Sequence, residues 1–130
     1  MVFGDVLVND RQSEHLRGHR GSAYEPLRSM PAMAPEDGFR ILDRASFLEF
    51  MLLRRRCVLA QTAIGRRDVL IASKFDHALG GYEEWEFFTR VAAGTAMAYH
   101  DPPTVIIAEH DSHMASRMVM MDANQVKVRA

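Results

Sequence analysis

The sequence has a single cysteine, no long apolar run and no leader-like start. Cys57 cannot form an internal disulfide, and because it opens the apolar run 57–60 we interpret it as a small buried residue rather than a nucleophile. No stretch approaches the roughly 20 apolar residues that a membrane-spanning helix needs. The first residues also lack the basic start and apolar stretch of a signal peptide. These absences predict a protein of the reducing cytoplasm with no membrane partner.

A large charge of either sign is also absent. The 16 Lys and Arg side chains nearly balance the 17 Asp and Glu side chains, so the formal net charge is -1. A protein with so little net charge has no global field to attract a polyanion, and nucleic acid is therefore not the favoured partner. Hydrophobic residues make up 48% of the chain, which is typical of a globular protein, and the length suits one domain.

The first third of the sequence differs in composition from the rest. A short β-branched segment at 2–8 predicts a strand, and a polar stretch without apolar periodicity follows it. We therefore predict an extended polar arm at 1–38 and a core domain at 39–130. An arm of this length is either a flexible tail or a segment that takes its order from a partner, and on the second interpretation we expect a protein partner or a homo-oligomer. The arm carries four sparse apolar residues as candidate partner-binding anchors: Tyr24, Leu27, Met30 and Met33.

The core is predicted to be α+β, with a small antiparallel sheet of three to five strands and two helices. Apolar residues at helical spacing follow Asp43, a suitable N-cap, and predict a helix that closes at the arginines 54–56. Later elements are expected to be hairpin strands at 57–64 and 69–75, a third strand at 85–91, an edge strand at 95–99, a helix at 104–121 and a last strand at 125–129.

Several of these segments resemble small uncharacterised proteins of tailed bacteriophages and prophages. The matching segments are Arg55–Thr62 with Gly65, then 69–77 ending in Asp76-His77, then Trp85–Thr89, and Thr104 with the histidine-bearing segment after it. The similarity covers about residues 39–118. It departs where Phe88-Thr89 lacks an intervening acidic residue and where the last histidine is offset. The resemblance implies a phage-encoded accessory protein in the host cytoplasm or in the virion, and it carries no activity.

Histidines beside carboxylates are the main candidates for chemistry. His77 follows Asp76, and His110 and His113 lie three residues apart, so on a helix they would share one face. His77, His110 and His113 could bind a divalent metal, which would be the only cofactor. The spacing matches no zinc-peptidase motif, however, and Asp76 at a chain reversal is also explained by a turn in which its carboxylate accepts a nearby backbone N–H. No catalytic residue is predicted.

Two pairs of arginines are candidate nucleic-acid contacts. Arg55 and Arg56 precede one predicted strand, and Arg66 and Arg67 lie in the turn after it, so the two pairs could meet on one side of the sheet and contact phosphates. The alternative is a solvated helix end and a solvated turn. With a net charge of -1, the second interpretation is favoured over nucleic-acid binding.

Two functional hypotheses follow from different classes. In the preferred one, the protein is a phage accessory protein that acts through protein–protein interaction, either as a virion component such as a capsid-stabilising protein or as an inhibitor of a host factor. Its arm would dock on the partner. In the alternative, the histidine and aspartate residues form a small metal-dependent hydrolase or a ligand-sequestering site. The sequence favours a binding protein over an enzyme.

Overall fold

A five-stranded mixed sheet forms the centre of the protein. The computed structural model describes residues 1–9, 16–18, 26–33, 37–54 and 58–108. Within them the strand order is β2-β1-β5-β4-β3, with bounds β1 Val2–Asn9, β2 Leu16–Gly18, β3 Ala32–Met33, β4 Phe39–Leu42 and β5 Ala98–Ala108. The predicted α+β class is confirmed. The prediction of an antiparallel sheet is wrong for its centre, because strands β1 and β5 run parallel.

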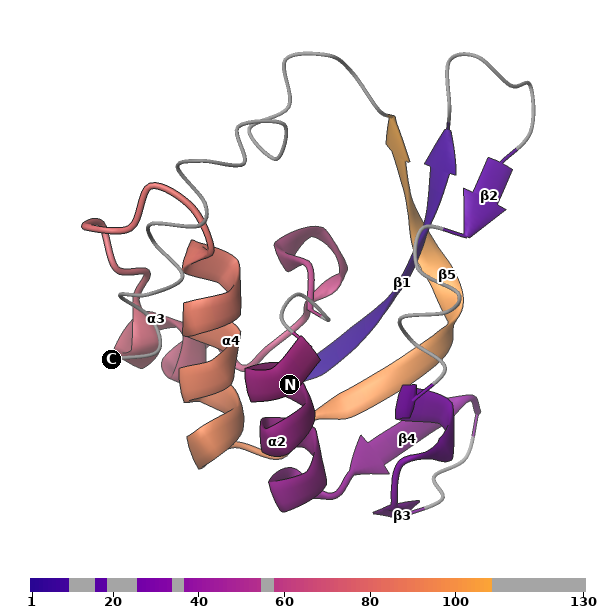
Figure 1. Ribbon diagram of the computed structural model, residues 1–130, viewed down its shortest axis with the longest axis horizontal. Coiled ribbons are helices and arrows are strands. Elements are labelled where there is room, and N and C mark those ends of the chain that lie inside the picture. The colour runs from indigo at the N-terminus through magenta and orange to yellow at the C-terminus, as the bar shows by residue number, and fades with distance from the viewer. Residues whose placement is uncertain (10–15, 19–25, 34–36, 55–57, 109–130) are drawn as a thin grey trace.

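Helices pack on one side of this sheet. They are α2 (Arg44–Arg54), α3 (Arg67–Ser73) and α4 (Glu83–Gly94), with a short 3₁₀ turn η1 at Ala60–Thr62. Figure 1 shows α2 and α4 side by side, and the Trp85 indole N–H joins them by donating to the Met51 carbonyl at 2.7 Å. None of the helices within the described ranges is long and apolar enough to cross a membrane.

The N-terminal strand is the inner strand of the sheet and not part of a separate arm. The predicted strand at 2–8 is confirmed as β1, which pairs with β2 on one side and with β5 on the other. Phe3 is fully buried, and its ring lies 5.5 Å from the Phe47 ring of α2 and 5.6 Å from the Tyr99 ring of β5. Residues 26–29 form a helical turn, and Leu27 within it is also fully buried. The described parts of 1–38 therefore belong to the core, and the predicted boundary between arm and core is wrong there.

Helix α2 forms as the sequence predicts. Asp43 is its N-cap: one carboxylate oxygen accepts the Ser46 backbone N–H at 2.9 Å and the Ser46 hydroxyl at 2.8 Å. These hydrogen bonds lower the pKa of Asp43. Phe47, Phe50 and Met51 then fall three and four residues apart and face the core.

The predicted hairpin and third strand are wrong, because both segments are helical. Residues 67–73 form α3, and residues 83–94 form α4. The buried residues Trp85, Phe88, Val91 and Ala92 recur at three- and four-residue spacing, which is the period of a helix. Three glutamates in the first turn add favourable interactions with the helix dipole. The aromatic content that suggests a strand is therefore overridden by the periodicity of burial.

The second predicted helix does not begin at Thr104. Residues 98–108 form one long strand, β5, and Pro102 and Pro103 lie inside it at an irregularity in the pairing with β1. Proline is tolerated at such a bulge because no backbone N–H is needed there. The remainder of that predicted helix, 109–121, and the last predicted strand, 125–129, lie outside the described residues.

One hydrophobic core connects the sheet and the helices. It combines side chains from both central strands, from the 26–30 segment and from α2 and α4. Its buried members are Phe3, Leu27, Met30, Leu42, Phe47, Phe50, Met51, Val58, Trp85, Phe87, Phe88, Val91, Ala92, Met97 and Tyr99.

Candidate functional site

The predicted metal ligands are not brought together within the described residues. His77 is exposed in a turn, and no group of three or more His, Cys, Asp or Glu side chains there could hold a metal ion. His110 and His113 lie outside the described residues, so the metal site stays a prediction. Beside His77, the Asp76 carboxylate accepts the Ala78 backbone N–H at 2.8 Å. The turn interpretation of Asp76 is therefore confirmed, although a helix and not a strand precedes it.

The two described members of the arginine set lie at the start of α3. The Arg66 guanidinium donates to both carboxylate oxygens of Asp68, at 3.1 and 2.7 Å, and Arg67 is exposed. The ion pair lowers the pKa of Asp68 and raises that of Arg66, with the hydrogen bond as the main cause. Arg55 and Arg56 lie outside the described residues. Nucleic-acid contact by this set stays a prediction.

Two of the four predicted partner-binding anchors are core residues. Leu27 is 0% exposed and Met30 is 8% exposed, because both pack into the core shared with α2 and the sheet. They cannot contact a partner without unfolding this region, so the prediction is wrong for these two residues. Met33, in the edge strand β3, is 68% exposed and remains available. Tyr24 lies outside the described residues.

A polar cluster interrupts the central strand pair. Gly4 pairs with His100 and Val6 pairs with Val105, so Asp5 alone faces the four residues 101–104. Asp5 is only 4% exposed, and its carboxylate accepts the Val6 backbone N–H at 2.7 Å. The bulge packs closely on β1: a Cβ on Gly4 would lie 3.1 Å from the Thr104 hydroxyl, so only glycine fits without displacement. The bulge places the buried carboxylate of Asp5 opposite the segment 101–104 of β5.

Asp101 is the centre of this cluster. One of its carboxylate oxygens accepts the Tyr99 hydroxyl at 2.9 Å and the Arg28 Nε–H at 2.6 Å. Burial alone would raise the pKa of Asp101, but the hydrogen bonds from Arg28 and Tyr99 outweigh it and the pKa is lowered. The pKa of Tyr99 is raised, first by burial and then by its hydrogen bond to the carboxylate. The phenol therefore stays protonated and ties the 26–29 turn, through Asp101, to the central strands.

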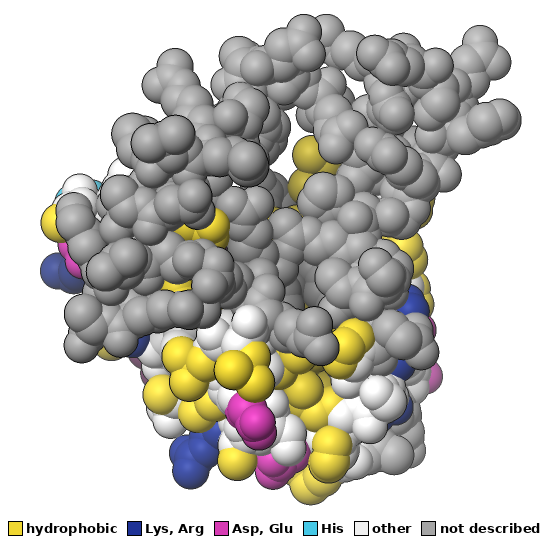
Figure 2. All heavy atoms as spheres, in the orientation of Figure 1, with side chains coloured by type: hydrophobic (Ala, Val, Ile, Leu, Met, Phe, Trp, Pro, Cys, Tyr) yellow, Lys and Arg dark blue, Asp and Glu magenta, His cyan; other side chains and the backbone are white. Residues whose placement is uncertain are grey.

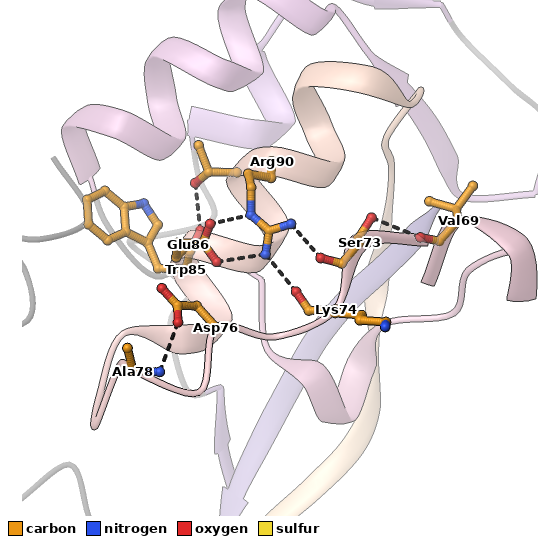
Figure 3. Close-up of polar contacts among 9 residues, drawn as sticks. Val69, Ser73, Lys74, Asp76, Ala78, Trp85, Glu86 and Arg90 are labelled. Carbon is orange, nitrogen blue, oxygen red and sulfur yellow. Dashed lines mark hydrogen bonds and ion pairs between the residues drawn. The ribbon is translucent and has the colours of Figure 1, made fainter. Parts of the chain in front are cut away.

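One arginine of α4 forms the polar contact with the end of α3 (Figure 3), beside the stacked rings of Phe75 and Phe87. The Arg90 guanidinium donates to the carbonyls of Ser73 and Lys74 at the end of α3, at 2.5 and 2.7 Å, and forms an ion pair with Glu86 one helical turn earlier. The hydrogen bond to Glu86 is the main reason that the pKa of Arg90 is raised. Two carbonyls that the α-helical pattern leaves free are thereby satisfied from α4. This contact fixes α3 on the surface of the helical layer.

Helix α3 packs on the core through Val69, which is partly buried, and turns its other large apolar side chains outward. It has no buried residue, and Ile71 is 53% exposed. Leu70, at 37% exposure, lies over Gly65, since its Cδ2 would be 3.2 Å from a Cβ at that position. Ile64, next to Gly65, is 76% exposed although its backbone pairs with Val2 of β1. We refer to Ile64, Leu70 and Ile71 as the α3 patch.

Helix α2 adds further exposed apolar area. Leu52 is 51% exposed and Leu53 is 67% exposed in its last turn. On the face shown in Figure 2, hydrophobic side chains gather on the described part of the helical layer, where α2 and α4 lie in Figure 1. Large exposed apolar groups that adjoin one another are typical of interaction surfaces. The arrangement suits binding through apolar contact.

Comparison with known proteins gives no relative. No family model matches the chain, and neither the curated proteins nor the solved structures contain a significant match.

Proposed function

We propose that this protein acts by binding another protein, and that the α3 patch is its docking surface. The observation that carries the proposal is that α3 has no buried residue while Leu70 and Ile71 are exposed on it. An isolated helix of seven residues would not be stable in water. Here the hydrogen bonds from Arg90, the packing of Val69 on the core and the stacking of Phe75 on Phe87 hold the helix in place, so the outward apolar side chains are presented on a supported backbone.

The docking surface differs from the one expected from the sequence. Leu27 and Met30 lie in the core, which removes half of the predicted anchors from the N-terminal segment. The exposed aliphatic side chains of the α3 patch offer more apolar surface than Met33 alone. The resemblance to phage proteins supports the finer assignment of a phage-encoded accessory protein, whose partner would be a virion protein or a host factor.

Site-specific crosslinking tests this proposal in the producing bacterial cell. A photo-crosslinking residue is introduced at position 71 of one variant and at position 33 of a second, matched variant. Both positions are exposed, at 53% and 68%, so neither change disturbs packing. We expect a discrete protein adduct from position 71 and none from position 33.

The other outcomes are equally informative. An adduct only from position 33 would return the docking role to the N-terminal segment, and the absence of any adduct from position 71 would refute the α3 patch as a docking surface. The mass of the adduct also separates a second copy of this chain from a different protein.

A further inference from the structure

Positive and negative side chains nearly balance over the whole chain, but they do not balance along α3. Residues 66–74, which form α3 and its two caps, contain three Lys or Arg side chains and one Asp side chain, in a protein whose net charge is -1. The excess positive charge of this segment is therefore compensated elsewhere in the sequence. A docking surface on α3 lies on a helix with an excess of positive charge.

The local pairing of these charges determines what a partner would meet. Asp68 is neutralised by Arg66, and Glu86 is neutralised by Arg90. Asp76 lies beyond the end of α3, where its carboxylate closes the turn onto Ala78. The acidic groups nearest to the patch are thus engaged within the protein.

Two cations remain beside the apolar side chains. Arg67 is exposed and lies three and four residues before Leu70 and Ile71, so it is their neighbour on the helix surface. Lys74 is exposed at the other end, where it is the C-cap of α3. Neither side chain forms an ion pair with another described residue. Two cations therefore flank the apolar pair Leu70–Ile71, one at each end.

We infer that the segment that docks on the α3 patch is an acidic amphipathic helix. This inference rests on the proposed function. The apolar face of such a helix would cover Leu70, Ile71 and Ile64, and its carboxylates would reach Arg67 and Lys74. Complementary charges at the rim of an apolar contact select the partner and speed its association, whereas a basic segment would be repelled.

Two synthetic peptides test the inference on the full chain. Both carry leucines at positions i, i+3, i+4 and i+7, one has glutamate at its remaining polar positions, and the other has lysine there. Binding is measured by fluorescence anisotropy at low and at high salt. We expect the glutamate peptide to bind more tightly than the lysine peptide by roughly tenfold or more, and its affinity to fall as salt is added.

Charge reversal supplies the decisive comparison. The double variant R67E/K74E is expected to lose binding to the glutamate peptide and to gain binding to the lysine peptide. Ile71→Ser is expected to lose binding to both peptides. Met33→Ser, at a distant exposed position, is the matched control and should bind as the natural sequence does. Because Arg67, Lys74 and Ile71 are exposed, these variants are expected to fold, and circular dichroism checks it.

Each contrary result refutes the inference in a distinguishable way. Equal binding of both peptides would leave only an apolar contact, which overturns the acidic partner but not the docking surface. Binding of phosphatidylserine vesicles in place of the glutamate peptide would overturn it in favour of an anionic lipid surface. If neither peptide binds, the inference fails, and the adduct from position 71 still decides the proposed function by itself.

Discussion

Replacing Leu27 by alanine tests whether this side chain belongs to the core or to a docking segment. The side chain is fully buried among core residues from the sheet and α2. Truncation of a buried leucine costs about 2–5 kcal/mol, from lost transfer free energy and from the cavity that remains. Met33→Ala, six residues later on an exposed edge strand, is the matched control and should change the free energy of unfolding by less than about 0.5 kcal/mol.

Urea unfolding followed by fluorescence measures both changes. The single tryptophan, Trp85, is 2% exposed and reports loss of the core. With a urea dependence of about 1–3 kcal/mol per molar for a small domain, Leu27→Ala should lower the midpoint by roughly 1–2 M. A midpoint that moves no further than that of Met33→Ala would refute the placement of residues 26–30 in the core. It would also restore the N-terminal arm as a separate docking element.

Two further predictions concern the polar contacts. Burial and Asp101 raise the pKa of Tyr99 above its unfolded value of about 10, so the contribution of Tyr99 to stability is complete below pH 10 and is lost as the pH rises toward the folded pKa. The loss is up to about 1.4 kcal/mol per pH unit. Urea midpoints measured from pH 9 to 11 should show this slope, and those of Tyr99→Phe should lack it. A lysine at position 90 cannot contact Glu86 and the carbonyls of Ser73 and Lys74 at once, so Arg90→Lys should weaken the contact between α3 and α4 by about 1 kcal/mol. Amide hydrogen exchange should then accelerate in α3 and stay unchanged in α4.

Sequence reasoning succeeds where local chemistry decides the structure. The start of α2 is predicted correctly because Asp43 has its own capping partner, Ser46, within the same turn. The turn at Asp76 follows from the same kind of short-range hydrogen bond. The strand at 2–8 is recognisable because the short segment is rich in valine, a β-branched residue. Each of these signals lies within a few residues of the structure that it specifies.

Sequence reasoning fails where partners distant in the chain decide the structure. Leu27 lies in a polar, proline-containing stretch, and only its contact with a core built from later residues makes it an interior side chain. Pro102 and Pro103 are a strong local stop signal, yet β5 continues through them because β1 pairs on both sides of the bulge. Neither outcome follows from the composition of a short window. The placement of α3 has the same origin, since the Arg90 guanidinium reaches the Ser73 carbonyl from 17 residues away in the chain.

The same distinction decides which functional hypothesis the surface can support. A segment cannot be an interior part of the fold and a free docking arm at the same time, and burial of Leu27 and Phe3 commits the described parts of residues 1–38 to the core. A docking role must then fall to apolar side chains that the core does not use. On α3 those side chains lie between two cations and are held by a contact that contributes nothing to their burial. A surface that is fixed in place but left uncovered has a partner as its simplest physical explanation.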